Sequence, residues 1–318
     1  MKVILVFIML FATLIVGCDF KQKGHIEKVG MMFTETIDDQ VWGTVGYKGL
    51  REIELELKTD IYYRENIDSD QVVLETIEEF QELGVNFIVG HGSEFVPFFN
   101  KYSKEFPNIH FISMNGKAEN ENITCIQFDS YSMGFFGGMV AAKMSKNEKV
   151  GIVSAYGWQS EANGFIEGAK FQNPNIEVKL EIVNGWYKED EAVEFTERMI
   201  ADGVDVLYPV GNNYNVPMTD KAKEHGIYII GYLTDQMVHG EETVLTSTVQ
   251  YVDQVYVEAA SQFNEGKLEG GDLSVDFSKG VIKMGRFSSL VPSDFQEQIN
   301  YYVRRYIQTG KLPTTEGG

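Results

Sequence analysis

Cysteine and positive charge are both scarce in this sequence. Among its 318 residues there are only two cysteines, too few for a disulfide framework. Lys and Arg together number 27 against 47 Asp and Glu, which gives a formal net charge of −20. Binding to duplex DNA or to an anionic membrane surface depends on clustered Lys and Arg, and the sequence shows no such cluster. The charge balance therefore argues against direct nucleic-acid binding and indicates a solvated acidic surface.

Sequence motifs for catalysis and metal binding are also missing. The chain has no GxSxG turn, no GxGxxG after a strand and no credible Cys–His pairing, and Gly90–Ser93 lacks the lysine of a P-loop. Its five histidines show no HxH or HxxxH spacing, which argues against a metal site. We therefore expect a protein that is not an enzyme, with no catalytic residues, no metal and no cofactor.

An apolar run near the start of the chain is typical of a leader rather than of the fold. Val3–Val16 has the length of a signal-peptide core and is too short to span a bilayer as a permanent helix. The run ends in Gly17-Cys18, and a small residue before a cysteine at this point is similar to a bacterial lipobox, whose cysteine receives a diacylglycerol. The alternative is an ordinary secretory leader with an accidental cysteine.

The lipobox interpretation assigns a role to each cysteine. Residues 1–18 are expected to be a lipoprotein signal peptide and lipobox, with Cys18 lipidated, and residues 19–28 a polar tether. The lipid would anchor the protein to the cell membrane on its extracytoplasmic face. Cys125 lies in an apolar, strand-like run, where it is most simply a small core residue.

Beyond the tether, strand-like and helix-like segments alternate. The expected strands of the first series are Val29–Phe33, Thr59–Arg64, Asn86–Val89, Ile109–Ser113 and the run around Cys125. The helices between them are expected to begin at Trp42 and to cover Ser69–Leu83 and Glu94–Phe106. Such alternation predicts a parallel sheet with right-handed crossovers.

A second series of the same kind follows. Its expected strands are Lys149–Ser154, Glu177–Ile182, Val206–Val210 and Ile227–Tyr232. Its expected helices are Met133–Met144, where glycines permit close packing, Asn163–Lys170, Glu191–Asp202 and Met218–His225. The last third is less regular, with expected strands Val244–Val249 and Lys279–Arg286 and expected helices Val252–Phe263 and Ser293–Ile307. The two series predict two α/β lobes facing each other across a cleft.

The irregular last third is expected to return to each lobe in turn. The first lobe would then hold residues 26–128 and 245–277, and the second lobe residues 129–244 and 278–318. Several chain crossings of this kind would form a hinge between the lobes.

Loops that follow parallel strands gather at the carboxyl edge of a sheet, where α/β proteins bind ligands. In the first series these loops include Gly90–Ser93, from which His91 and Ser93 could contact a ligand, although a loop histidine can also be simply solvated. In the second series, Asn212 and Asn213 could line the cleft or only turn the chain.

Several segments, in order along the chain, resemble the basic-membrane-protein family, which is typified by purine-nucleoside-binding lipoproteins of ABC importers. The segment Asp38–Leu50, DDQVWGTVGYKGL, is similar to the family element DDKSFNxxxxxGL. Further matching segments are FFGGMVAAKMSK from Phe135, GFIEGAK from Gly164, GVDVLYPVG from Gly203, IGYLTDQ from Ile230 and VLTSTVQYVD from Val244. The resemblance implies an α/β type I periplasmic-binding-protein fold, with two Rossmann-like lobes that close on a ligand by a hinge motion.

The resemblance also implies a site in which two aromatic rings hold a base. Trp42 stands at the family's first stacking position and Trp186 lies near the second, so two indoles could stack on a flat ring. For each tryptophan the alternative is simple packing. The polar positions that remain for the ligand are Asp39, Asp235 and Gln236.

Three polar positions of the family site are changed here. Gly43 replaces an Asn, Leu233 replaces an Asp, and Gln250 lies where the family usually has Lys. Each lost partner of a ribose hydroxyl should cost about 1–3 kcal/mol, which argues against tight nucleoside binding of the usual kind. The cleft is therefore expected to be aromatic with altered specificity, or else empty.

Two functions remain open at this point. The family resemblance implies binding of a small nucleoside-like ligand, with an ABC permease as partner. Within the family, segments such as TIDDQVWGTVGYKGL and VLTSTVQ are most similar to a subgroup that promotes competence gene expression in bacilli. Because a DNA-binding helix-turn-helix would have to precede the first strand, where the leader stands, such regulation is expected to be indirect.

Overall fold

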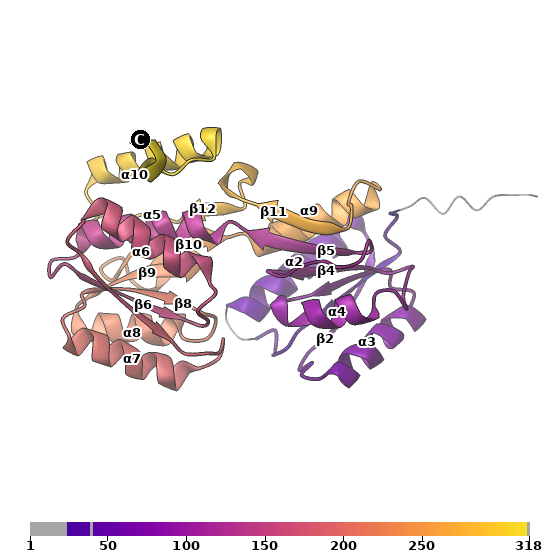
Figure 1. The fold of residues 1–318 in the computed structure, drawn as a ribbon. Coiled ribbons are helices and arrows are strands. Elements are labelled where there is room, and N and C mark those ends of the chain that lie inside the picture. The colour runs from indigo at the N-terminus through magenta and orange to yellow at the C-terminus, as the bar shows by residue number, and fades with distance from the viewer. Residues whose placement is uncertain (1–23, 39–40, 317–318) are drawn as a thin grey trace, which may run out of the picture.

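The chain folds into two α/β lobes that lie side by side (Figure 1). The computed structural model describes residues 24–38 and 41–316. The first lobe has a parallel sheet in the order β11-β5-β4-β3-β1-β2. Its strands are β1 (Lys28–Met32), β2 (Asp60–Arg64), β3 (Phe87–Gly90), β4 (His110–Met114), β5 (Ile123–Phe128) and β11 (Gly271–Val275).

The second lobe repeats this plan in the order β12-β10-β9-β8-β6-β7. Its strands are β6 (Lys149–Ser154), β7 (Glu177–Ile182), β8 (Val206–Val210), β9 (Tyr228–Leu233), β10 (Val244–Gln250) and β12 (Ile282–Met284). All neighbours pair in parallel except β12, which runs antiparallel to β10. In each lobe the second strand lies at one edge, beside the first, which is the strand order of doubly wound α/β folds.

Helices connect the strands and cover the sheets (Figure 1). Those of the first lobe are α2 (Trp42–Leu57), α3 (Asp70–Glu82), α4 (Val96–Tyr102) and α9 (Val252–Asn264). Those of the second lobe are α5 (Ser130–Met144), α6 (Ser160–Gln172), α7 (Glu189–Ala201), α8 (Asn215–His225) and α10 (Ser293–Thr309). Short 3-10 turns are η1 (Ser93–Phe95), η2 (Gln236–His239), η3 (Phe277–Lys279) and η4 (Pro313–Glu316).

Three chain crossings join the lobes. The chain leaves the first sheet after β5, returns after β10, and crosses again after β11. Adjacent crossings are hydrogen-bonded: the amide of Asp129 donates to the carbonyl of Val275 at 2.9 Å, and that of Tyr251 donates to Val281 at 2.8 Å. The two lobes, the three crossings and the strand order are those of the type I periplasmic-binding-protein fold, which confirms the predicted architecture.

The order of the last third corrects part of the sequence analysis. Residues 245–250 were assigned to the first lobe, but they belong to β10, which pairs with β9 in the second sheet. The return crossing therefore follows Gln250. Strand β11 was not predicted, because its alternating polar residues form a partly exposed edge, and the strand expected over Lys279–Arg286 is only Ile282–Met284 long.

The two helices α5 and α6 pack unusually closely. A Cβ on Gly138 would lie 2.1 Å from the carbonyl oxygen of Phe165, and one on Gly168 would lie 1.9 Å from that of Phe135. The backbones can approach this closely only because these positions have no side chain. Close packing was predicted for the α5 glycines; Gly134 and Gly138 provide it, whereas the contacts of Gly137 are looser, at 3.3 Å or more.

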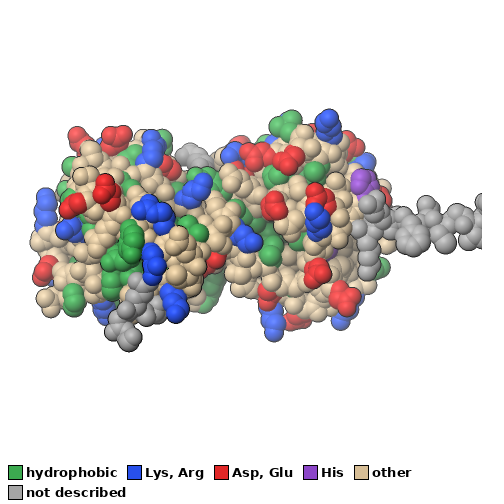
Figure 2. All heavy atoms as spheres, turned by 90° about the horizontal axis from the view of Figure 1, so that it is seen from above, with side chains coloured by type: hydrophobic (Ala, Val, Ile, Leu, Met, Phe, Trp, Pro, Cys, Tyr) green, Lys and Arg blue, Asp and Glu red, His purple; other side chains and the backbone are tan. Residues whose placement is uncertain are grey.

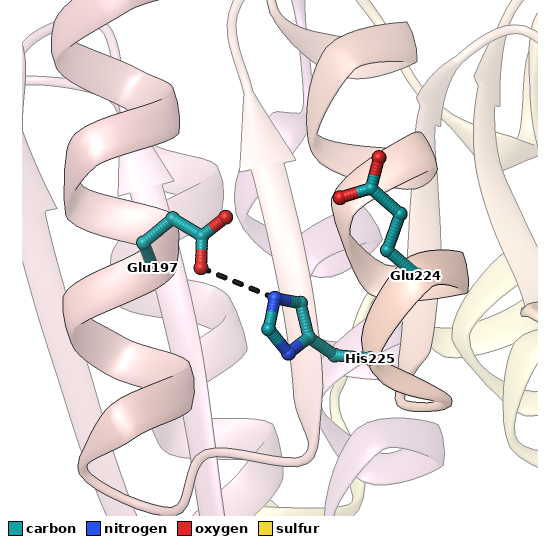
Figure 3. Close-up of side chains that lie close together, drawn as sticks. All are labelled: Glu197, Glu224 and His225. Carbon is teal, nitrogen blue, oxygen red and sulfur yellow. Dashed lines mark ion pairs between the residues drawn. The ribbon is translucent and has the colours of Figure 1, made fainter.

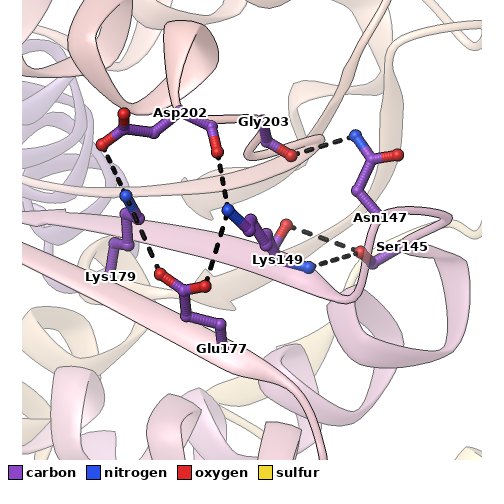
Figure 4. A network of polar contacts seen from close by, with 7 residues as sticks. All are labelled: Ser145, Asn147, Lys149, Glu177, Lys179, Asp202 and Gly203. Carbon is purple, nitrogen blue, oxygen red and sulfur yellow. Dashed lines mark hydrogen bonds and ion pairs between the residues drawn. The ribbon is translucent and has the colours of Figure 1, made fainter.

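A polar network secures the second lobe at the amino ends of its strands (Figure 4). The ammonium of Lys149, at the start of β6, donates to the carbonyl of Asp202 at 2.9 Å and lies 3.6 Å from Glu177. Lys179 pairs with Asp202 at 2.5 Å. These contacts join β6, β7 and the turn after α7 at the edge opposite the carboxyl ends of the strands, and each surface ion pair contributes at most about 1 kcal/mol.

Two further predictions concern the membrane and the second cysteine. In the described part of the chain, no helix combines the length and the apolar character needed to cross a bilayer. The predicted leader, Cys18 and the first half of the tether lie outside the described residues. Cys125 is buried in β5 as predicted, and burial raises the pKa of its thiol to about 11.

Candidate ligand-binding cleft

A cavity of about 240 Å³ lies between the two lobes, at the carboxyl edges of both sheets. Loops after β3 and β4, together with the end of β5 and the start of α2, form its first wall. Loops after β6, β7 and β8 and the ends of β9 and β10 form the second. The lining residues are Trp42, Gly92, Ser93, Glu94, Asn115, Gly116, Gln127, Phe128, Ser130, Trp158, Gln159, Ser160, Glu161, Trp186, Asn212, Tyr232 and Gln250.

The indole of Trp42 forms the aromatic surface of the first wall. It stacks on the imidazole of His91, with ring centroids 4.1 Å apart and an interplanar angle of 18°. One face of the indole is therefore covered by the protein while the side chain also borders the cavity. A ring backed in this way is a rigid platform for a flat ligand.

His91 holds this platform from behind. Its Nε2 donates to the carbonyl of Trp42 at 2.8 Å, which requires the hydrogen to be on Nε2, because a carbonyl can only accept. Nδ1 then accepts from the hydroxyl of Tyr256 at 2.8 Å. The side chain is buried, and burial lowers its pKa to about 3, so His91 is neutral at physiological pH.

Two glycines of α2 permit this arrangement. A Cβ on Gly46 would lie 2.6 Å from Nε2 of His91, and a Cβ on Gly43 would lie 2.4 Å from the carbonyl oxygen of Thr36. Gly43, expected to contact ligand, instead packs against the loop after β1 and borders a small crevice behind Trp42. Any side chain at Gly43 would require this loop to move.

The second wall carries a cluster of three aromatic side chains. Tyr156 stacks on Trp158 at 5.6 Å between centroids, and Trp186 meets the edges of Tyr156 and Trp158 at 5.2 and 5.9 Å. Trp158 and Trp186 both border the cavity, and Trp158 is 56% exposed. Because Trp42 borders the same cavity from the first lobe, a flat ligand can contact indoles from both lobes.

A buried carboxyl group lies beside these rings. Glu161, in the first turn of α6, accepts hydrogen bonds from the hydroxyl of Tyr232 at 3.0 Å and from Nε2 of Gln159 at 3.3 Å. Gln159 is held in turn by the hydroxyl of Ser154 at 2.8 Å. Burial raises the pKa of Glu161 above its ordinary value of 4.5.

Two further polar side chains, a carboxyl group and an amide, border the cavity from the first lobe. Glu94, in the loop after β3, is half-buried, and burial raises its pKa as well. Asn115, after β4, has a φ of 51°, a left-handed conformation that Asn tolerates better than most residues. Both residues border the cavity, which gives its first wall an acid and an amide.

The structure brings together only part of the predicted site. The predicted residues that border the cavity are Trp42, Ser93, Trp186, Asn212 and Gln250. The predicted residues that do not border it are Gly43, His91, Asn213, Asp235 and Gln236. Asp39 lies outside the described residues. His91 is neither solvated nor pointed at the cavity, because both of its ring nitrogens bind groups of the first lobe.

The Asp235–Gln236 segment is turned away from the cavity by its own contacts. Asp235 pairs with Arg286 at 2.7 Å, and the backbone amide of Gln236 donates to the hydroxyl of Ser247 at 3.0 Å. Just before them, Leu233 has a φ of 70° and its side chain is buried. An Asp tolerates this backbone better than Leu does, so packing of the Leu233 side chain offsets the strain.

Several lining residues were missed by the sequence analysis. They are Glu94, Asn115, Gln127, Phe128, Ser130, Trp158, Gln159, Ser160, Glu161 and Tyr232. Trp158 and Glu161 come soon after the expected strand Lys149–Ser154, so their position at the carboxyl edge was an available signal. No comparable signal existed for Gln127 or Tyr232, which lie within strands whose facing sides depend on tertiary packing.

One group of potential metal ligands exists among the described residues, in the C-terminal halves of α7 and α8. Glu197 on α7 and Glu224 and His225 on α8 bring ligand atoms within 4.8 Å of one another, and Figure 3 shows the pairing of His225 with Glu197. The ammonium of Lys221 lies 3.3 Å from Glu197 and 2.8 Å from Glu224. Because Lys221 pairs with both carboxylates and His225 with one of them, we interpret the group as a surface ion-pair cluster.

The surface shows no broad basic face in the view from above (Figure 2). Acidic and basic side chains are interspersed over both lobes there, with neutral surface between them. With a net charge of −20, this pattern does not resemble the concentrated positive surface that DNA binding needs.

Comparisons with known proteins identify relatives of this chain among substrate-binding proteins and a transcriptional activator. The family model described as ABC transporter substrate-binding protein, PnrA-like (Bmp), matches residues 26–316. The chain is 46% identical over 312 residues to the transcriptional activator protein Med of Bacillus subtilis, covering 97% of this chain and 98% of that protein. It is 23% identical over 290 residues to a purine-binding protein of Brucella abortus, covering 90% and 82%.

A solved structure supports the same assignment. The crystal structure of a transcriptional activator of the comK gene from Bacillus halodurans matches with a TM-score of 0.84 and 42% identity, covering 90% of this chain and 99% of that chain. Because the family model spans both lobes and the crossings between them, the chain belongs to the Bmp family of PnrA-like ABC-transporter substrate-binding proteins.

Proposed function

We propose that this protein is a membrane-anchored ligand-binding lipoprotein that holds a small, flat, nucleoside-like molecule between its lobes. The observation that carries the proposal is the cavity at the carboxyl edges of both sheets, bordered by Trp42 from one lobe and by Trp158 and Trp186 from the other. A ligand that contacts both walls would stabilise the closed arrangement of the lobes.

The size and polarity of the cavity favour a small molecule. Its volume of about 240 Å³ is near the lower bound, roughly 300 Å³, of ordinary ligand sites, so a peptide would not fit. The side-chain amides of Asn115 and Asn212 border the cavity and can donate to and accept from a heterocycle or its substituents. The amides of Gln127 and Gln159 already bind groups of the protein. A relative described as purine-binding supports a ring of this class.

The polar groups differ from those that the resemblance led us to expect. Gln250 borders the cavity, but Asp235 and Gln236 do not, and Leu233 offers no acceptor. We therefore propose altered specificity rather than purine nucleoside binding of the usual kind. Lipidation of Cys18, motivated by the lipobox-like Gly17-Cys18, would place the protein on the extracytoplasmic face of the cell membrane, where it could deliver its ligand to an ABC permease.

Thermal unfolding in the presence of purine and pyrimidine nucleosides tests ligand binding, with tryptophan fluorescence recorded in parallel. A ligand at a hundred times its dissociation constant stabilises the folded state by about 2.7 kcal/mol. We expect an increase in melting temperature together with a change in indole emission, because all three tryptophans of the chain border the cavity. The absence of both changes for every nucleoside would contradict the nucleoside-like assignment.

A second candidate function is positive regulation of competence gene expression. It is favoured by the 46% identity to Med of Bacillus subtilis over nearly the whole of both chains. The acidic composition and the predicted leader make direct action on DNA unfavourable, so regulation would act through a sensed ligand or a membrane partner. Deleting the gene and measuring a competence-gene reporter tests this function, and an unchanged reporter would contradict it.

A further inference from the structure

The charges around the cavity have one sign. Among the described residues that border it, the charged side chains are Glu94 and Glu161, and none is Lys or Arg. Glu94 comes from the first lobe and Glu161 from the second, so each wall carries one carboxyl group. A phosphate or carboxylate ligand would find no basic side chain among these residues, which disfavours nucleotides as ligands.

Neither carboxyl group forms an ion pair within the described chain. The partners of Glu161 are neutral, namely the Tyr232 hydroxyl and the Gln159 amide. Glu161 is only 5% exposed, and an uncompensated charge at such a site is costly. Its place in the first turn of α6 favours the ionised form, while burial opposes it. A cation in the cavity would offset this cost.

The aromatic lining suits the same kind of ligand. All three tryptophans of the chain border the cavity, and indole is the side chain that attracts cations most strongly through its ring face. The group behind Trp42 is the buried His91, which stays neutral because its pKa is about 3. A positive charge over the exposed face of Trp42 would therefore meet no repulsion from behind.

We propose that the cleft recognises a small organic cation, with its positive centre against the indoles and its charge offset by Glu161 and Glu94. This inference rests on the proposed function, because it names the class of ligand that the same cavity would hold. A protonated or methylated heterocycle, including a cationic nucleoside, has the required flat shape and charge. Neutral rings of the same shape should bind more weakly.

Isothermal titration calorimetry with matched probes tests the proposal on the purified full-length protein. One pair is 1-methyladenosine, a cation at neutral pH, and its neutral isomer N6-methyladenosine. The second pair is 1-methylnicotinamide, a permanent cation, and neutral nicotinamide. For at least one pair we expect the cation to bind at least about tenfold more tightly than its neutral counterpart.

Substitutions then connect this preference to the two carboxyl groups. Glu161→Gln should reduce the preference for the cation to nearly none, whereas Glu167→Gln, on the exposed face of the same helix, should leave it unchanged. If Glu161→Gln does not fold, as judged by circular dichroism, Glu94→Gln on the opposite wall provides the same test. Its effect should be smaller, because Glu94 is less buried.

The outcomes separate this inference from the proposed function. Equal affinity for both members of each pair, or a cation preference that survives Glu161→Gln and Glu94→Gln, would overturn the inference and leave the proposed function intact. Absence of binding by all four probes and by unmodified nucleosides would overturn both. Cation preference that is lost with the carboxyl groups would support both.

Discussion

Trp42 and His91 are joined by two reciprocal hydrogen bonds as well as by ring stacking. The indole nitrogen of Trp42 donates to the carbonyl of His91 at 3.4 Å, and Nε2 of His91 donates to the carbonyl of Trp42 at 2.8 Å. The start of α2 and the end of β3 are thereby held in one orientation. The flat wall of the first lobe depends on this pair, and the first predictions concern it.

Replacement of Trp42 tests the wall directly. Loss of one base–aromatic stacking contact costs about 1–3 kcal/mol, so Trp42→Ala should weaken ligand binding roughly tenfold or more. Trp42→Phe should retain most of the affinity, because a ring remains at this position. Both variants should keep the wild-type circular dichroism spectrum. Equal affinity of the Ala variant and the wild type would show that Trp42 does not contact the ligand.

Replacement of Gly46 tests the support behind the wall. The added methyl group of Gly46→Ala would lie 2.6 Å from Nε2 of His91, so the imidazole or α2 must move. Overpacking of this kind costs about 1–3 kcal/mol of unfolding free energy, and the displaced indole should also bind ligand more weakly. Gly137→Ala, in α5 with neighbours no closer than 3.3 Å, is the matched control and should be nearly neutral. Urea unfolding of both variants measures the difference.

Stability should fall in mild acid because of two buried histidines. Burial lowers the pKa of His91 to about 3 and that of His110 to about 4, against an ordinary value of 6.5. The unfolded state therefore takes up more protons below about pH 6.5, and each buried histidine costs up to about 1.4 kcal/mol of stability per pH unit as pH falls toward its folded pKa.

A comparison of histidine variants isolates this effect from the titration of carboxyl groups. The destabilisation caused by His110→Gln at pH 7 should shrink at about pH 5, because only the wild type then carries the histidine penalty. His25→Gln, at an exposed position, should show no such change. Urea unfolding at both pH values measures it, and a constant difference for His110→Gln would contradict the assignment.

The first crossing between the lobes depends on Asp129. Its carboxylate accepts from the amide of Ser132 at 3.4 Å, which caps α5, and it also binds the hydroxyls of Ser132 and Tyr306. Asp129→Ala removes all of these contacts and should cost about 1–2 kcal/mol of unfolding free energy. Tyr306→Phe removes only one and should cost less. Thermal unfolding compares them, and equal costs would show that the cap contributes little.

Lipidation of Cys18 can be tested apart from ligand binding. Cells that express the wild type and are grown with labelled palmitate should yield a labelled protein in the membrane fraction. Cys18→Ala should lose the label and leave the membrane fraction. Label that persists in this variant would rule out Cys18 as the modified residue.

The local pattern of the sequence was sufficient to predict most strands and helices of the two lobes. Strands β6, β7 and β8 have the predicted bounds, and α2 begins at Trp42 as expected, because apolar runs and helical periodicity are local properties. The polar edge strand β11 and the lobe that holds residues 245–250 were not predicted correctly. Both depend on which strand lies alongside, and nothing within the segment specifies its neighbour.

The cleft itself was determined only in part by the sequence. The family resemblance placed Trp42 and Trp186 at the cleft, and both border the cavity, Trp42 from the start of α2 and Trp186 from the loop after β7. Burial of His91 depends on Tyr256, which is 165 residues further along the chain, and Glu161 is held by Tyr232, 71 residues away. The sequence by itself therefore determined the two lobes and the edge where they face each other. Only the tertiary structure decided which side chains point into the cleft, because that choice is made by contacts between segments far apart in the chain.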